Sequence, residues 1–169
     1  MIKPERLRAD HAEALPAFER ENRSHFARTV PDRGDACFSE FPSRLRVLLA
    51  EQDAGVCHFH GVVDDRGDLV GRVDLVEVED GRADLGYRVA ERAAGRGVAT
   101  GAVEEVCRPA TEAHRLSALT AAATLDNPAS RAVPARTGFT AVDGITLDGR
   151  PGVRYRRRLS PSAPHGPAA

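Results

Sequence analysis

The fold is decided by the stretch Leu85-Gly86-Tyr87-Arg88-Val89-Ala90-Glu91-Arg92-Ala93-Ala94-Gly95-Arg96-Gly97-Val98-Ala99-Thr100, which predicts a strand, a glycine-containing turn and the start of a helix. Gly95 and Gly97 can adopt positive φ and let a ligand approach the backbone closely. Amide N–H groups of such a turn point into a concavity at the positive end of the following helix, where an anion binds well. Arg92 and Arg96 add guanidinium groups suited to phosphate oxygens. The stretch therefore predicts a ligand that carries a phosphate or pyrophosphate.

The spacing of this turn excludes two common phosphate motifs. The dinucleotide fingerprint G-x-G-x-x-G needs a glycine where Thr100 stands, and a Walker loop needs a Gly-Lys pair, whereas Lys3 is the only lysine of the chain. What remains is Arg-x-x-Gly-x-Gly at a strand-to-helix junction. By itself this short motif does not separate a phosphate loop from an ordinary helix-entry turn.

A second segment favours the phosphate loop. An apolar run from Leu119 to Leu125 is followed by Asp126-Asn127-Pro128-Ala129-Ser130-Arg131-Ala132-Val133-Pro134-Ala135-Arg136-Thr137-Gly138-Phe139. Asn127 is suited to cap a helix, Pro128 to its first position and Gly138 to a left-handed C-cap. Two strand-to-helix junctions of this kind form a crevice at the carboxyl ends of strands, where α/β proteins bind ligands.

These segments resemble the GCN5-related N-acetyltransferase (GNAT) superfamily. Arg92-x-x-Gly95-x-Gly97-x-Ala99-Thr100 looks like its acyl-CoA pyrophosphate loop. Asn127-x-x-Ser130 followed by Thr137-Gly138-Phe139 is similar to its second block, and Asp84-Leu85-Gly86-Tyr87 to the strand before the loop. The branch that the chain resembles most contains the ribosomal-protein-alanine N-acetyltransferases. The resemblance covers roughly Gly71 to Phe139, and the flanks match only loosely.

The resemblance implies an α/β (α+β) fold: one domain over residues 1–159, with a mixed, mostly antiparallel sheet and helices on both faces. It also implies direct transfer of an acetyl group from acetyl-CoA to a primary amine in a ternary complex. The residues that it assigns to the cosubstrate are Val89, Arg92, Ala94, Gly95, Arg96, Gly97, Val98, Ala99, Thr100, Asn127 and Ser130.

For the chemistry, the resemblance points to Asp84 and Ser130. Asp84 occupies the place where many relatives carry glutamate, so it is expected to take the amine proton or to position a water that does; the other interpretation is a surface carboxylate. Many relatives place a tyrosine acid seven residues after the asparagine, where this chain has Pro134. Ser130 is therefore the expected hydroxyl near the CoA sulfur. Pro134 also removes a helix hydrogen bond to the carbonyl of Ser130.

Composition fits one globular domain. The chain has 169 residues and a formal net charge of −1, which gives no overall field toward nucleic acid or an anionic membrane. Its three cysteines form no CxxC pair and predict free thiols in a reducing, cytoplasmic compartment. No signal peptide or membrane-spanning run is evident. Cys57-His58-Phe59-His60 places two histidines on one strand face without a third ligand, so no metal site is expected. The Pro-, Ala- and Ser-rich tail 160–169 is expected to be disordered.

Patterning predicts the elements around the two junctions. Strands are expected over 2–7, 55–63, 68–78, 83–89, 117–125, 139–147 and 153–159, and helices over 9–23, 37–52, 98–114 and 128–137.

The sequence leaves three questions open. The acceptor is a protein N-terminus or a small-molecule amine, and Glu21, Asp32 and Asp35 could receive a cationic amine or be ordinary surface charges. The protein is a monomer or a homodimer. Pro134 keeps open an acyl-CoA-binding module without activity, and an unrelated nucleotide-binding α/β protein is the other alternative.

Overall fold

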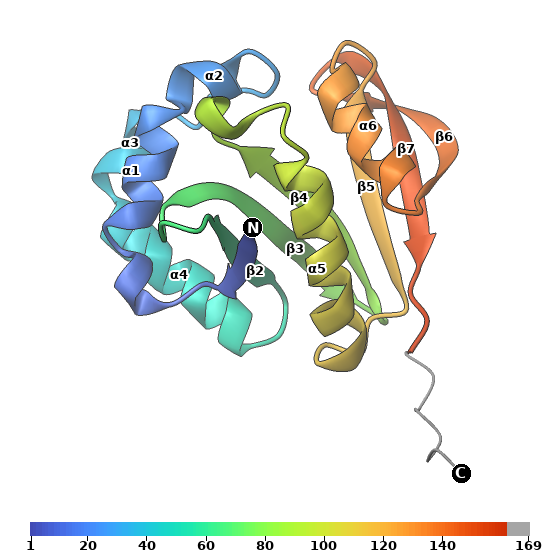
Figure 1. The fold of residues 1–169 in the computed structure, drawn as a ribbon, viewed down its shortest axis with the longest axis horizontal. Helices are drawn as coiled ribbons and strands as arrows, with labels where there is room; N and C mark the ends of the chain where they lie inside the picture. The colour runs from blue at the N-terminus through green and yellow to red at the C-terminus, as the bar shows by residue number, and fades with distance from the viewer. Residues whose placement is uncertain (162–169) are drawn as a thin grey trace.

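The computed structural model describes residues 1–161, so most of the predicted disordered tail lies outside the described residues. Within them, seven strands form one mixed sheet in the order β1-β2-β3-β4-β5-β7-β6 (Figure 1). Only β4 and β5 run parallel; every other neighbouring pair is antiparallel. The strands are β1 (Lys3–Arg6), β2 (His58–Val63), β3 (Leu69–Glu79), β4 (Arg82–Val89), β5 (Ala118–Thr124), β6 (Thr140–Leu147) and β7 (Arg150–Arg158).

Helices cover both faces of this sheet, as predicted. Helix α5 packs over β1, β3 and β4, α1 and α4 pack against β3 and β2, and α6 packs against β5 (Figure 1). The α-helices are α1 (Ala14–Glu21), α2 (Arg23–Ala27), α3 (Asp35–Ser39), α4 (Phe41–Asp53), α5 (Val98–Glu112) and α6 (Pro128–Arg136), and the short 3₁₀ helices are η1 (Ala9–His11) and η2 (Glu91–Ala93). The predicted fold class is confirmed.

Two predicted helices differ from the observed ones. The helix expected over 37–52 is broken at Glu40 into α3 and α4, with a proline in the first turn of α4. The helix expected over 9–23 begins as a 3₁₀ turn and continues as α1, and α2 follows directly after Asn22. Proline fits the first turn of a helix better than its interior. The observed helices therefore begin shortly before Pro16 and Pro42, whereas the sequence predicts both prolines inside a longer helix.

The last hairpin is tighter than predicted. Strand β7 begins at Arg150, so the turn consists of Asp148 and Gly149, with φ of 49° and 77°. Positive φ at both central residues matches the right-handed twist of the paired strands.

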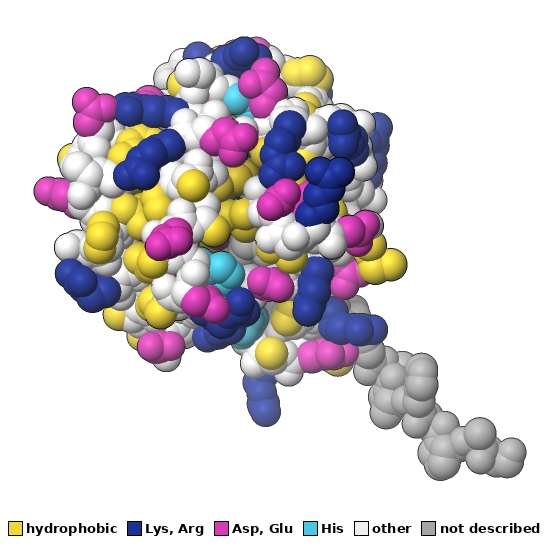
Figure 2. All heavy atoms as spheres, turned by 60° about the vertical axis from the view of Figure 1, so that its left-hand side comes forward, with side chains coloured by type: hydrophobic (Ala, Val, Ile, Leu, Met, Phe, Trp, Pro, Cys, Tyr) yellow, Lys and Arg dark blue, Asp and Glu magenta, His cyan; other side chains and the backbone are white. Residues whose placement is uncertain are grey.

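The core lies between the sheet and α5. Leu75 and Leu119 on the strands and Val103 and Val106 on α5 are fully buried. They follow the helical and strand periods that the sequence predicts. Elsewhere the surface mixes charges: on the side that carries α1 and α4, cationic and anionic side chains are interspersed (Figure 2). No helix in the described part of the chain is long and apolar enough to cross a membrane.

Candidate active site

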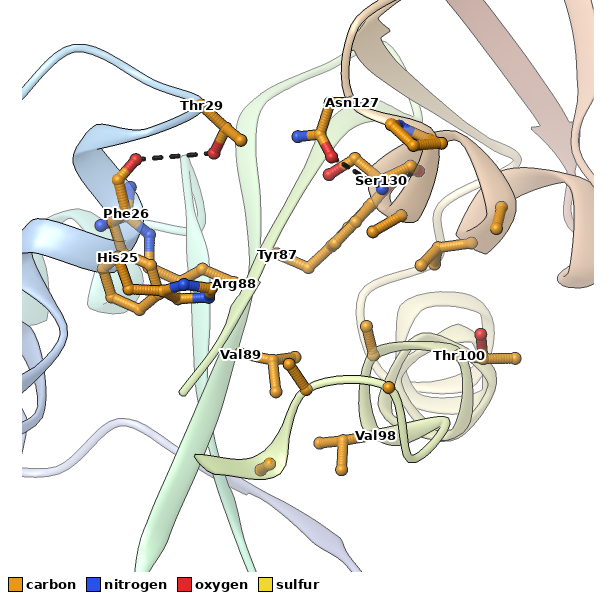
Figure 3. Close-up of a pocket in the computed structure, with 18 of the residues that line it drawn as sticks. His25, Phe26, Thr29, Tyr87, Arg88, Val89, Val98, Thr100, Asn127 and Ser130 are labelled. Carbon is orange, nitrogen blue, oxygen red and sulfur yellow. Dashed lines mark hydrogen bonds between the residues drawn. The ribbon is translucent and has the colours of Figure 1, made fainter. Parts of the chain in front are cut away.

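A cleft forms where the two parallel strands separate. β4 and β5 pair only from Arg82 to Asp84 of β4, after which β4 continues to Val89 beside β3 and β5 continues to Thr124 beside β7. A cavity of about 630 Å³ lies at this divergence, lined by the end of β4, the glycine turn, the first turn of α5, α6 and the α2 region (Figure 3). The crevice predicted from the two strand-to-helix junctions is therefore present.

The glycine turn forms one wall of the cavity and is open toward it. Gly95 and Gly97 have φ of 73° and 75°, and a Cβ at either position would meet no protein atom within 4 Å. Gly97 is the N-cap of the 15-residue helix α5, and no side chain caps its first turn. The first-turn N–H groups thus face the cavity at the positive end of the helix, an arrangement suited to an anion.

Nine of the residues assigned to the cosubstrate line this cavity. They are Val89, Ala94, Gly95, Gly97, Val98, Ala99, Thr100, Asn127 and Ser130.

Arg92 and Arg96 do not line it, and both are exposed. The Arg92 guanidinium instead lies 3.4 Å from the carbonyl oxygen of Leu69 and 3.9 Å from a carboxylate oxygen of Asp64. For either arginine to contact a phosphate at the glycine turn, its exposed side chain would have to rotate toward the cavity.

Helix α6 forms the opposite wall. The Asn127 side chain accepts a hydrogen bond from the Ser130 N–H at 3.1 Å, which fixes the predicted helix start. Pro134 lies inside the helix and supplies no N–H to the Ser130 carbonyl. That carbonyl instead accepts a hydrogen bond from the Tyr87 hydroxyl at 2.6 Å, across the cleft from β4 (Figure 3). Burial raises the pKa of Tyr87, so its phenol stays protonated and remains a donor.

Asp84 lies beside the cleft and does not line the cavity. It is exposed at the last β4–β5 pair, where the Thr120 hydroxyl donates to its Oδ1. A hydrogen bond to Asp84 and the negative charge of its carboxylate raise the pKa of Glu77. Glu77 adopts φ of 52° at an irregularity in the pairing of β3 with β4, a backbone feature with no signal in the sequence pattern.

The end of the cavity away from the glycine turn is built by α2 and the residues after it. His25, Phe26, Arg28, Thr29 and Val30 line it together with Arg88 of β4 (Figure 3). The segment after α2 thus contributes residues 28–30 to this wall. Sequence reasoning missed Arg136, which also lines the cavity, because nothing in the pattern of α6 distinguishes it from a solvated arginine.

The two histidines that the sequence places on one face of β2 both contact neighbouring groups. His58 stacks on His114 with ring centroids 3.4 Å apart, and the His60 Nδ1 lies 3.1 Å from the carbonyl oxygen of Val73. No group of three or more ligand-type side chains suited to a metal occurs among residues 1–161.

Residues 5–140 match the family model described as acetyltransferase (GNAT) domain. A candidate ribosomal N-acetyltransferase named YdaF, from Bacillus subtilis (strain 168), is 33% identical over 89 residues. That match spans about half of each chain, 49% in both cases.

Solved structures share the fold over nearly the whole chain. The ribosomal-protein-S5-alanine acetyltransferase from Vibrio fischeri superposes with a TM-score of 0.88 at 19% identity, covering 96% of both chains. The microcin C7 self-immunity acetyltransferase MccE, solved with acetyl-CoA and AMP, gives a TM-score of 0.81 at 17% identity, covering 94% of this chain and 92% of that one.

Proposed function

This chain belongs to the acetyltransferase (GNAT) domain family, and on that premise we propose that it transfers an acetyl group from acetyl-CoA to a primary amine. The observation that carries the proposal is the cavity between the separating strands β4 and β5, closed at one end by the glycine turn and the start of α5. A thioester and an amine can meet in such a cleft, because its lining brings the end of β4, the glycine turn and α6 together with the α2 region.

The cosubstrate fits the glycine-turn wall by its chemistry. Pyrophosphate oxygens need several N–H donors, and the uncapped first turn of α5 supplies them. A Cβ at Gly95 or Gly97 would meet no atom of the described residues within 4 Å, so phosphates can approach the backbone there. Arg136, which has no ion-pair partner among the described residues, is a further cation on the α6 wall. Bound acetyl-CoA would supply the activated acetyl group.

The protein's own groups have three tasks in this reaction. The acceptor is an ammonium at neutral pH and must lose a proton before its nitrogen can attack, and we assign this proton to Asp84 through water, with Glu77 hydrogen-bonded to it. The thioester oxygen gains negative charge during attack and needs hydrogen-bond donors, which the unpaired edge of β4 near Val89 can supply. We assign to the Ser130 hydroxyl, on the α6 wall of the cavity, the hydrogen bond to the departing sulfur.

The alternative, a module that binds acyl-CoA without catalysis, is favoured by one feature. Pro134 occupies the position where many superfamily members carry a tyrosine acid. The two functions differ in outcome: the module binds acetyl-CoA and releases no thiol with any amine.

The experiment is an acetylation assay with the purified protein, acetyl-CoA and a panel of amines that includes N-terminal peptides, free amino acids and polyamines. Thiol release and a mass increase of one acetyl group on an acceptor are the expected results. Binding of acetyl-CoA without turnover on any acceptor would contradict the transferase and leave the binding module.

Three finer proposals concern the compartment, the bounds of the domain and the acceptor. Cys37, Cys57 and Cys107 are free thiols, which agrees with a reducing compartment such as the cytoplasm. The proposed catalytic domain extends over residues 1–159, and the proposed acceptor classes are a protein N-terminus or a small-molecule amine.

A further inference from the structure

The acceptor end of the cleft has a distinct charge composition. At the end formed by α2 and β4, the described residues that line the cavity and can carry positive charge are His25, Arg28 and Arg88, and no aspartate or glutamate lines the cavity. An amine-binding site for a polycation normally presents carboxylates to the second and third charges, because a buried cation needs a partner. The lining therefore speaks against polyamines and aminoglycosides as acceptors.

Arg88 is held in position at this end. Its Nη1 donates to Glu19 Oε2 at 2.9 Å, and its Cζ lies 4.6 Å from the centroid of the Phe26 ring. Glu19 is itself buried and paired with Arg72 at 2.7 Å, so the anchor is rigid. The Nε and Nη2 atoms of Arg88 have no hydrogen-bond acceptor in the described part of the chain, and the residue lines the cavity (Figure 3). An oriented guanidinium with free donors is a carboxylate-binding group.

The surroundings of Arg88 carry more positive than negative charge. Arg72 and Arg88 are balanced by Glu19 and Asp74. Arg33 adds a guanidinium that has no ion pair within residues 1–161, and burial together with the positive charges of Arg88 and Arg72 lowers its pKa. A bound anion would relieve this repulsion between like charges.

Carboxylates nearby on the chain are already engaged. Asp32 and Asp35 pair with Arg23 at 2.7 and 2.9 Å, and Glu91 pairs with Arg28 at 3.4 Å. Asp32 and Asp35 share the single guanidinium of Arg23, and neither lines the cavity, so the hypothesis that they receive a cationic amine there loses its support. His25, in contrast, is not engaged at its Nδ1, which is buried and has no hydrogen-bond partner among residues 1–161, and the residue lines the same end of the cavity.

We propose that the acceptor is an amine whose molecule carries a carboxylate close to the amine, and that Arg88 binds this carboxylate from the wall formed by α2 and β4. This inference rests on the proposed function and names its substrate class. The acidic N-terminal segment of a protein and a small amino acid share this chemistry, and the experiment separates them.

The test measures binding rather than turnover. Short peptides with a free N-terminal alanine, followed either by aspartate and glutamate or by lysine, are titrated into the protein saturated with CoA, with fluorescence anisotropy as the readout. The acidic peptide is expected to bind, and the basic peptide and spermine are expected not to. Displacement of the acidic peptide by free aspartate points to a small amino acid, and its absence points to a protein N-terminus.

Variants assign the effect to Arg88. Arg88→Gln is expected to weaken acidic-peptide binding roughly 10- to 100-fold, the effect of losing a charge-assisted hydrogen bond. Arg33→Gln is expected to weaken acidic-peptide binding about 2- to 5-fold. Because this substitution removes no ion pair, it tests the charge of the site even if Arg88→Gln fails to fold. Arg46→Gln is the matched control, because Arg46 is an exposed α4 arginine that donates a hydrogen bond to the Ser43 hydroxyl and forms no ion pair within residues 1–161.

Two results would overturn the inference: binding of the basic peptide or spermine at least as strong as that of the acidic peptide, or acidic-peptide binding that is unchanged in a folded Arg88→Gln variant. The proposed function fails separately, if no amine releases thiol from acetyl-CoA, whatever the charge preference in binding.

Discussion

The Tyr87 hydroxyl on β4 donates a hydrogen bond of 2.6 Å to the main-chain carbonyl of Ser130 on α6. In an ordinary helix the N–H of residue 134 would take that carbonyl, but Pro134 has none. The phenol thus satisfies the acceptor that the proline leaves free, and it ties together the two walls of the cleft. Pro134 and Tyr87 form one structural unit around the residue proposed to act on the CoA sulfur.

Tyr87→Phe tests this unit. The variant leaves the Ser130 carbonyl without its donor, so the free energy of unfolding is expected to fall by about 1 kcal/mol. Ser130 is then less well oriented, and kcat is expected to fall roughly 10- to 100-fold while the KM for acetyl-CoA stays near the wild-type value. Stability is measured by denaturant unfolding and activity by thiol release.

A second substitution separates orientation from simple damage. In Tyr87→Phe/Pro134→Ala the restored N–H of residue 134 can bond the Ser130 carbonyl, so part of the lost kcat is expected to return. Tyr155→Phe, a buried tyrosine on β7, serves as the control for losing a phenol. No recovery in the double variant would show that the phenol acts in some other way.

Gly97→Val tests whether the glycine turn binds the pyrophosphate of the cosubstrate. A branched side chain at φ of 75° strains the backbone and projects into the space left for the ligand. Acetyl-CoA affinity is expected to fall roughly tenfold or more, the equivalent of at least about 1.4 kcal/mol. Calorimetric titration measures it.

The control for this variant is Gly149→Val in the β6–β7 turn, where φ is 77° and the surrounding space is also empty. Both variants should lose roughly 1–3 kcal/mol of stability from backbone strain. Only Gly97→Val should lose affinity, and equal affinity in the two folded variants would remove the glycine turn from the cosubstrate site.

Much of this architecture could be predicted from the sequence, for reasons visible in single residues. Gly95, Gly97, Asn127 and Pro128 fix local backbone geometry, and local geometry can be read from neighbouring residues. The apolar period of α5 likewise identifies its buried face.

The features that escaped prediction depend on contacts between distant segments. The bond from Tyr87 to Ser130 links residues 43 positions apart, and the one from Arg88 to Glu19 links residues 69 positions apart. No local pattern encodes such pairs. The irregularity at Glu77 arises from the register of β3 against β4, which side-chain alternation along one strand does not fix.

Asp84→Asn tests the proposed proton acceptor. An amide cannot take a proton at neutral pH, so kcat is expected to fall roughly 10²- to 10⁴-fold with little change in the KM for acetyl-CoA. Because Asp84 raises the pKa of Glu77, removing its charge should also lower the pKa of Glu77, which NMR titration of that carboxyl measures. Asp80→Asn, in the neighbouring turn, is the control. Wild-type kcat in Asp84→Asn would leave Asp84 a surface carboxylate.

The stacked pair His58 and His114 predicts acid sensitivity of the fold. Burial, followed by the charges of His114, Arg6 and His60, lowers the pKa of His58 from 6.5 to about 4. The folded state therefore favours neutral His58, and this contribution is complete above pH 6.5 and is lost as the pH falls toward 4. The loss is expected to be on the order of 2 kcal/mol. Denaturant unfolding between pH 7.5 and 4.5 measures it, and His58→Phe should flatten the curve; an unchanged slope would contradict this origin.

The most direct test of the central claim is calorimetric titration of acetyl-CoA into the purified protein, with CoA, ATP and NAD as comparison ligands. The account predicts saturable binding of acetyl-CoA and CoA, weakened in Gly97→Val, and no comparable heat with ATP or NAD. Binding of ATP or NAD without binding of acetyl-CoA would contradict it and would make the cavity beside Gly95 and Gly97 the phosphate site of a different ligand.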